Sequence, residues 1–130
     1  MTPNEYQKEA LRTDPTAGYS SFYSFPDAAA LGSRIGNWQN ARLLNGLMGL
    51  SGESGEALDL PKKHIFQGHE LDRTHLEKEL GDVAWYLALS ADALGFTLEE
   101  ILQTNIGKLR ERYPQGFDTK KSTHRAADDV

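Results

Sequence analysis

Residues 53–82 decide how this chain folds; they read ESGEALDLPKKHIFQGHELDRTHLEKELGD. Two pairs of carboxylates lie at the ends of this stretch, Glu53 with Glu56 and Glu79 with Asp82, each pair spaced i, i+3. Residues three apart lie on the same face of an α-helix. The spacing therefore predicts two helices, each presenting one pair of carboxylates on a single face.

The two pairs are placed symmetrically about a glycine-containing turn. Gly68 lies near the midpoint between them and is suited to a helix C-terminal cap. If the chain turns there into an antiparallel hairpin, Glu53 comes level with Asp82, and Glu56 comes level with Glu79. The pattern predicts four carboxylates facing one another between two helices.

Four carboxylates in one place need a counter-charge. Two unit charges about 4 Å apart repel by roughly 4 kcal/mol at an effective dielectric constant of 20. Either their pKa values rise or a divalent cation binds between them. Oxygen ligands suit Mg²⁺, with Mn²⁺ as an alternative, and Mg²⁺ commonly completes its shell with substrate phosphates. The sequence thus predicts a metal site at Glu53, Glu56, Glu79 and Asp82, with phosphate chemistry.

The remaining pattern predicts an all-α bundle built on this hairpin. A short helix is expected over residues 3–12, and the two hairpin helices over 38–66 and 73–94, the second capped by Asp72. A third long helix follows at 98–113. Glycines at positions 46, 49, 52 and 55 each cost roughly 1 kcal/mol in a helix relative to Ala, which favours close approach of another helix there. Pro61 is expected to kink the first hairpin helix.

The chain reads as one domain, residues 1–130, in three parts. Residues 1–37 hold the N-terminal helix and a loop with Tyr19, Phe22, Tyr23 and Phe25; residues 38–117 form the catalytic core, and 118–130 a polar, flexible tail. The four aromatic residues would cover a ligand or fill the edge of the core. Those alternatives stay open.

Composition excludes several classes of protein. The chain has 130 residues, no Cys and a net charge of −5. The absence of Cys excludes a thiolate nucleophile and fits a cytoplasmic location, and the polar N-terminus does not resemble a signal peptide. The acidic charge argues against nucleic-acid binding, and no apolar run is long enough for a membrane helix.

The residues GLSGESGEALDLPKKHIFQGH, KELGDVAWYLALSADALG and NIGKLRERYPQGF together resemble the MazG-like nucleoside triphosphate pyrophosphohydrolases. The resemblance covers about residues 40–118 and rests on Glu53-x-x-Glu56, Glu79-x-x-Asp82 and Asn105-x-x-Lys108. It implies an all-α fold, Mg²⁺ at the carboxylates, hydrolysis of a nucleoside triphosphate to monophosphate and pyrophosphate, and assembly as a homodimer or homotetramer. The base, the sugar, the phosphorus attacked and the number of metal ions are not specified.

Several other residues are candidates for binding the substrate. Asn105, Lys108 and Arg112 recur at i, i+3 and i+7 and would form a stripe for the triphosphate tail; the alternative is a solvated outer face. Lys62 would reach a phosphate, or pair with Asp59. Trp38 and Trp85 would stack on a base, although aromatic residues on bundle helices commonly belong to the core.

Two other functions compete with hydrolysis. A di-iron bundle needs Glu-x-x-His on two helices, which this sequence lacks. A non-catalytic interaction module, whose acidic cluster binds a basic partner, remains the alternative. In the enzyme, Glu53 is the preferred general base.

Overall fold

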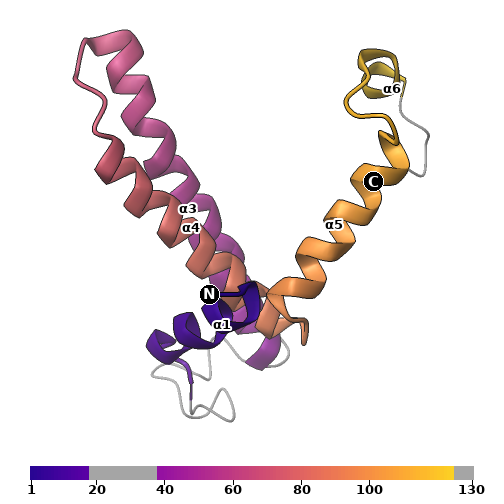
Figure 1. The fold of residues 1–130 in the computed structure, drawn as a ribbon. Helices are drawn as coiled ribbons and strands as arrows, with labels where there is room; N and C mark the ends of the chain where they lie inside the picture. The colour runs from indigo at the N-terminus through magenta and orange to yellow at the C-terminus, as the bar shows by residue number, and fades with distance from the viewer. Residues whose placement is uncertain (18–37, 125–130) are drawn as a thin grey trace. The chain divides into compact units, whose positions relative to one another are not determined.

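The computed structural model describes residues 1–17 and 38–124, and this part of the chain is all-α, as predicted, with no strand (Figure 1). Its helices are α1 (Pro3–Ala10), the 3-10 helix η1 (Leu11–Thr13), α3 (Trp38–Gln67), α4 (Arg73–Ala93), α5 (Leu98–Arg112) and α6 (Thr119–Thr123). None of these described helices is long and apolar enough to cross a membrane. The aromatic segment 19–25 lies outside the described residues.

The chain divides into two compact units, residues 1–98 and 99–130. The first unit holds the N-terminal segment and the hairpin of α3 and α4, and the second holds nearly all of α5 together with α6. The predicted packing of the third helix on the hairpin stays a prediction.

The antiparallel hairpin is confirmed, and its turn uses the expected residues (Figure 1). Gly68 follows α3 with φ +72°, in the left-handed region that favours glycine. Asp72 caps α4: its side chain accepts a hydrogen bond of 2.9 Å from the His75 backbone N–H. Pro61 lies inside α3 and does not end that helix.

Two glycines set the distance between the hairpin helices. A Cβ atom placed on Gly46 would collide with Ser90, and one placed on Gly49 would collide with the ring of Tyr86. The close approach predicted from the glycine run is therefore confirmed at these two positions. Next to this contact, Ala88 and Leu89 of α4 are fully buried.

The same contacts fix the register of the hairpin. Gly49 lies opposite Tyr86. Four residues further along α3 is Glu53, and four residues back along α4 is Asp82. One turn is close to four residues, so the register brings the acidic pairs level, as predicted.

We expect Gly49→Ala to lower the free energy of unfolding by about 1–3 kcal/mol, because the added methyl group must displace a packed aromatic ring. Gly52→Ala is the matched control in the same helix. Nothing lies within 4 Å of a Cβ atom there, so the better helix propensity of Ala should stabilise the protein by up to about 1 kcal/mol. Urea unfolding of both variants measures the difference, and equal effects would contradict the close packing at Gly49.

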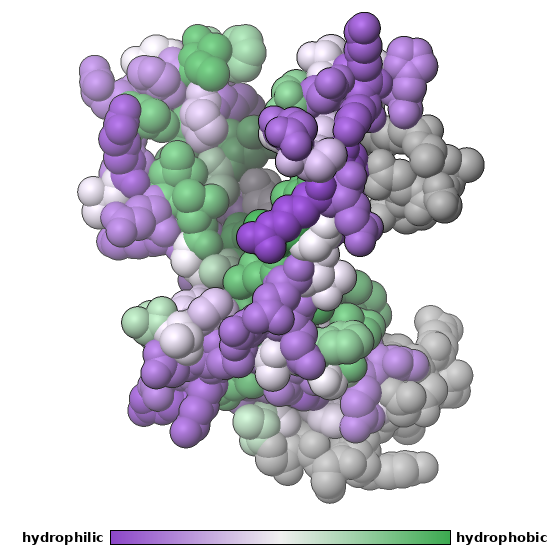
Figure 2. All heavy atoms as spheres, turned by 45° about the vertical axis from the view of Figure 1, so that its right-hand side comes forward, coloured by the Kyte–Doolittle hydropathy of each residue, from purple (hydrophilic) through white to green (hydrophobic). Residues whose placement is uncertain are grey.

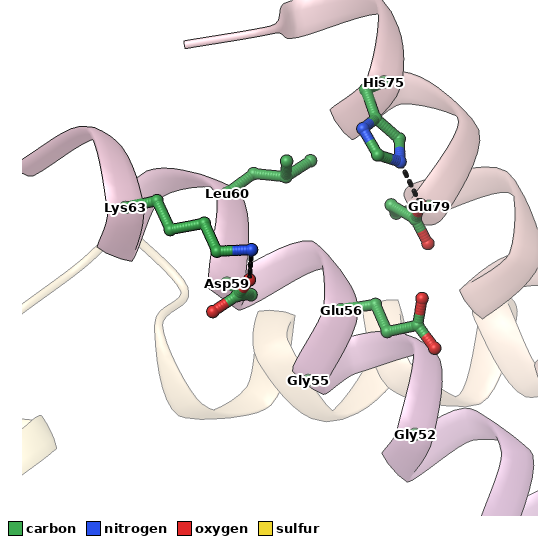
Figure 3. Close-up of a pocket in the computed structure, with 8 residues that line it drawn as sticks. All are labelled: Gly52, Gly55, Glu56, Asp59, Leu60, Lys63, His75 and Glu79. Atoms are coloured by element: carbon green, nitrogen blue, oxygen red, sulfur yellow. Dashed lines mark ion pairs between the residues drawn. The ribbon is translucent and has the colours of Figure 1, made fainter. Parts of the chain in front are cut away.

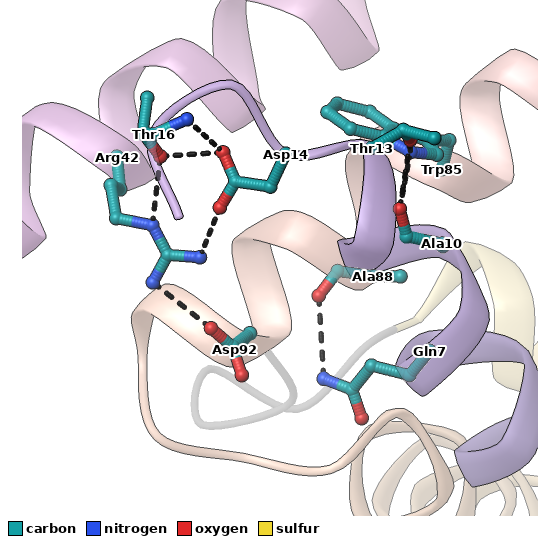
Figure 4. Close-up of polar contacts among 9 residues, drawn as sticks. All are labelled: Gln7, Ala10, Thr13, Asp14, Thr16, Arg42, Trp85, Ala88 and Asp92. Atoms are coloured by element: carbon teal, nitrogen blue, oxygen red, sulfur yellow. Dashed lines mark hydrogen bonds and ion pairs between the residues drawn. The ribbon is translucent and has the colours of Figure 1, made fainter. Parts of the chain in front are cut away.

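The N-terminal segment is held to the hairpin by a partly buried ion-pair network (Figure 4). Arg42 of α3 contacts Asp14 at 2.7 Å and Asp92 of α4 at 2.9 Å, and its Nε donates to the hydroxyl of Thr16 at 3.3 Å. The side chain of Asp14 is only 1% exposed. Burial alone would raise the pKa of Asp14, but hydrogen bonds from Thr16 and Arg42 outweigh burial and lower the pKa.

The segment that follows α5 contains a short helix. Residues 119–123, expected to lie in a flexible tail, form α6. The side chain of Asp118 accepts hydrogen bonds from the backbone N–H groups of Lys120 and Lys121, at 2.8 and 3.1 Å. This N-cap satisfies backbone donors at the start of α6, and the flexibility of the tail stays a prediction.

Candidate active site

Three of the four predicted carboxylates converge between the hairpin helices. Glu53 and Glu56 come from α3 and Glu79 from α4, and each offers one oxygen within 4.8 Å of the other two. Glu79 is buried, Glu53 is half-buried and Glu56 is exposed. The arrangement is a cluster of negative charge with one open side.

Asp82, the fourth predicted carboxylate, lies outside that group of three but close to it. Partial desolvation raises the pKa of Glu53, and the charges of Glu56, Asp82 and Glu79 raise it further. Because the charge of Asp82 acts on Glu53, the carboxylate of Asp82 lies near the other three. Asp82 itself is exposed.

The cluster opens into a cleft of about 460 Å³ between α3 and α4 (Figure 3). Its lining residues are Gly52, Gly55, Glu56, Asp59, Leu60, Lys63, His75 and Glu79. The side chains of Glu56 and Glu79 point toward one another across it in Figure 3. Neither Gly52 nor Gly55 has an atom within 4 Å of where a Cβ would lie. These two glycines border open space, unlike the two that permit helix contact.

His75 is a member of the site that the sequence analysis did not identify. Its Nε2 lies 2.7 Å from an oxygen of Glu79, one turn away on α4. The signal was present in the sequence, because residues at i and i+4 meet on a helix surface. His75 contacts a carboxylate, so no metal-ligand spacing marks it. The contact fixes one oxygen of Glu79 and leaves the carboxylate oriented toward the cleft (Figure 3).

The lysines of this region pair with a carboxylate of the same helix. Asp59 forms ion pairs with both Lys62 and Lys63, and the first of these pairs was one of the two expected alternatives. Hydrogen bonds from these two lysines, Lys62 first, lower the pKa of Asp59 to about 2. Lys63 lines the cleft together with Asp59, whereas Lys62 is not among the lining residues. Contact of Lys62 with a phosphate stays a prediction.

The donor set fits a hard divalent cation. Two oxygens bound to the same Mg²⁺ are at most about 4.2 Å apart, because each Mg–O distance is about 2.1 Å. The three carboxylates already lie within 4.8 Å of one another. Oxygens that neighbour one another in an octahedral shell lie only about 3 Å apart, so side-chain rotations would have to bring the carboxylates closer together. The exposed side chain of Glu56 has room for such a rotation. With these rotations the carboxylates would hold Mg²⁺ or Mn²⁺.

Trp85 is engaged with the protein's own N-terminal segment (Figure 4). Its indole N–H donates to the backbone oxygen of Ala10 at 3.0 Å and to the hydroxyl of Thr13 at 2.8 Å. The ring also meets Tyr86 edge to face, at 4.8 Å between centroids. These contacts favour the alternative in which Trp85 belongs to the core of the protein. Stacking of Trp85, or of the half-buried Trp38 at the start of α3, on a base stays a prediction.

The predicted phosphate-binding stripe lies on one helix. Asn105, Lys108 and Arg112 all belong to α5, as their spacing required. They are part of the second unit. Their role toward a triphosphate stays a prediction.

The site is thus an acidic cluster beside a cleft between two antiparallel helices, an arrangement that could hold a metal ion on an all-α scaffold. Comparison with known proteins identifies the family. Residues 42–117 match the MazG nucleotide pyrophosphohydrolase domain, which covers more than half of the chain, and the chain belongs to this family. The description of the domain names nucleotide pyrophosphohydrolysis, and the family generally uses divalent metal ions.

One relative comes from Mycobacterium phage L5, where it is called Gene 37 protein. It is 38% identical over 73 residues, which cover 53% of this chain and 64% of the relative. The match therefore spans less than two thirds of that relative, whose name states no activity. No solved structure matches the chain significantly.

Proposed function

We propose that this protein hydrolyses a nucleoside triphosphate to a nucleoside monophosphate and pyrophosphate, with Mg²⁺ as cofactor and Mn²⁺ as a substitute. The observation that carries the proposal is the convergence of Glu53, Glu56 and Glu79 from two helices, two of which, Glu56 and Glu79, line one cleft. Membership of the MazG family supports the reaction class. The volume of the cleft, about 460 Å³, lies in the range typical of sites for small molecules.

The roles of the residues follow from their positions. Mg²⁺ bound by the carboxylates would supply Lewis-acid polarisation of the phosphoryl oxygens. Glu53 is our candidate for the general base; in that role it would orient the attacking water beside the other two carboxylates instead of binding the metal ion itself. It takes a proton from the attacking water, a new P–O bond forms, and the phosphoanhydride bond to the pyrophosphate breaks.

Residues around the carboxylates would orient them and receive the substrate. The contact from His75 holds Glu79 in place. Lys63 places a positive charge at the cleft, and Asp59 restrains it there. A lysine at this position would attract the negative triphosphate toward the carboxylates.

A screen of canonical and modified nucleoside triphosphates, with pyrophosphate release as the readout, tests the proposal. We expect release with Mg²⁺ or Mn²⁺ and none with EDTA. Calorimetry separates hydrolysis from the non-catalytic alternative. An enzyme should bind nucleotide in a Mg²⁺-dependent manner, whereas a module that binds a basic protein should ignore nucleotide. Orthophosphate release without pyrophosphate would contradict the proposed bond cleavage.

The proposal includes self-association into a homodimer or homotetramer. Apolar side chains of α3 are exposed on the face opposite the one that meets α4: Leu44, Leu47, Met48 and Leu58. Figure 2 shows hydrophobic residues at the surface of the molecule among hydrophilic ones. Leu58 is 67% exposed and Met48 66%. A second copy covering this stripe would remove it from water, since exposed apolar patches commonly mark interfaces.

Sedimentation velocity measures the state of association directly. We expect the wild-type chain to sediment as a dimer or tetramer. Leu47→Glu combined with Leu58→Glu should shift it to monomer, because two charges would have to be buried in the interface. A wild-type chain that is monomeric at all accessible concentrations would contradict this part of the proposal.

A further inference from the structure

Helix α4 has two functional faces, and they serve different partners. Glu79 and Asp82 share the face that meets α3. Gly81, Trp85 and Ala88, spaced four and three residues apart, share another face. Each of these three residues is hydrogen-bonded to the N-terminal segment, residues 1–17.

The bonds to the second face come from three places along the segment. The hydroxyl of Tyr6 donates to the backbone oxygen of Gly81 at 3.3 Å. The amide of Gln7 donates to the backbone oxygen of Ala88 at 3.3 Å, and Trp85 donates to Ala10 at 3.0 Å (Figure 4). Three contacts over two turns hold α4 against rotation about its own axis.

Rotation of α4 matters because the carboxylates lie at the ends of long side chains. A side-chain tip lies about 5–6 Å from the helix axis, so a turn of about 10° moves it by about 1 Å. A displacement of that size is enough to impair a metal site. The N-terminal segment is therefore placed to control the geometry of the acidic cluster without touching it.

We infer that Tyr6 is a positioning residue for the metal site, acting through the peptide group that joins Gly81 to Asp82. Its hydroxyl is bonded to the carbonyl of that peptide group, one bond from the nitrogen of Asp82. This role rests on the proposed function, because it concerns the same carboxylates. It assigns a task to the N-terminal helix, which lies outside the residues matched to the family.

The electrostatics of Tyr6 agree with this geometry. Burial raises the pKa of its hydroxyl, and the negative charge of Asp82 raises it further. Tyr6 therefore stays protonated at neutral pH and remains a donor. The influence of Asp82 also shows that the ring lies close to the acidic cluster.

Tyr6→Phe in the full-length chain tests the inference, because it removes the hydroxyl and keeps the ring. We expect Mg²⁺ affinity, measured by calorimetry with MgCl₂ alone, to fall about three- to tenfold, the equivalent of losing one hydrogen bond that orients a ligand. Trp85→Phe, which keeps a ring at the next contact along this face, should lower it in the same direction. Tyr113→Phe, on the second unit, is the matched control and should leave it unchanged.

Thermal unfolding separates positioning from a merely structural role. A Tyr6→Phe variant that melts at a lower temperature but binds Mg²⁺ as tightly as the wild type at 25 °C would overturn the inference about Tyr6. That result would leave the proposed function intact. A wild-type chain that binds no Mg²⁺ would overturn the proposed function and this role with it. Weakened Mg²⁺ binding in a fully folded Tyr6→Phe variant supports the role.

Discussion

Glu56→Gln is expected to reduce Mg²⁺-dependent pyrophosphate release by about 100-fold or more. The substitution keeps the size of the side chain and removes one of three carboxylates that lie within 4.8 Å of one another. A neutral amide oxygen is a weaker ligand for a hard cation than a carboxylate. Steady-state kinetics with a saturating triphosphate and a Mg²⁺ titration measure the effect. Asp82→Asn should act in the same direction.

The control for this prediction is Glu77→Gln, an exposed glutamate two residues from Glu79 on the same helix. It changes the net charge equally but lies away from the cluster, so activity should be unaffected.

The thermal stability of Glu56→Gln offers a second test. Without metal, Glu56→Gln should not melt earlier than the wild type, because it relieves repulsion from its neighbours. With Mg²⁺ only the wild type should gain stability. Activity near the wild-type level in Glu56→Gln would remove the cluster from the mechanism.

Arg42→Met is expected to lower the free energy of unfolding by about 2–3 kcal/mol. The substitution leaves the buried carboxylate of Asp14 without its cation, while the partly exposed Asp92 recovers water. Arg12→Met is the matched control, since the ion pair of Arg12 with Glu9 is largely exposed. That control should cost less than about 0.5 kcal/mol. Urea unfolding at neutral pH compares the two.

The effect of Arg42→Met should depend on pH in a defined direction. Asp14 has a lowered pKa in the folded state, so its contribution is present above its ordinary value of 3.8 and is lost as the pH falls through the lowered value. In the variant, protonation of the buried carboxylate removes the unpaired charge. The difference between wild type and variant should therefore be largest at neutral pH and shrink as the pH falls toward the lowered pKa of Asp14 in the wild type. If the difference in free energy of unfolding between wild type and Arg42→Met did not depend on pH, the loss of stability would not arise at Asp14.

The hairpin was predictable because its signals are local and mutually consistent. Helical periodicity, Gly68 at the turn and Asp72 at the cap all indicate the same geometry, and the structure confirms them. The ion pairs of Arg42 were not predictable. They join residues 28 and 50 positions apart, and no short-range pattern marks such partners. The same reason explains why Tyr6 was not recognised, since its partner is 75 residues away.

The site was predictable as far as its ligands follow from helix register. The convergence of Glu53, Glu56 and Glu79 follows from spacing once the turn is placed and both helices turn their acidic pairs inward. Which of Lys62 and Lys63 lines the cleft was not accessible in this way. Adjacent residues on a helix point about 100° apart, so a small error in the assumed rotation exchanges them. Trp85 illustrates a further limit, because its hydrogen bonds depend on where a separate segment docks.

Gly52 and Gly55 leave one wall of the cleft made of bare main chain. Alanine at each position would improve helix propensity by about 1 kcal/mol, and the protein forgoes this gain twice within one turn. Main chain in a helix cannot change rotamer, so the width of the cleft on this side is set rigidly. A bulkier residue at either position would narrow the cleft and limit the size of the ligand that can enter. Such a substitution would raise the stability of the helix and lower the activity of the site.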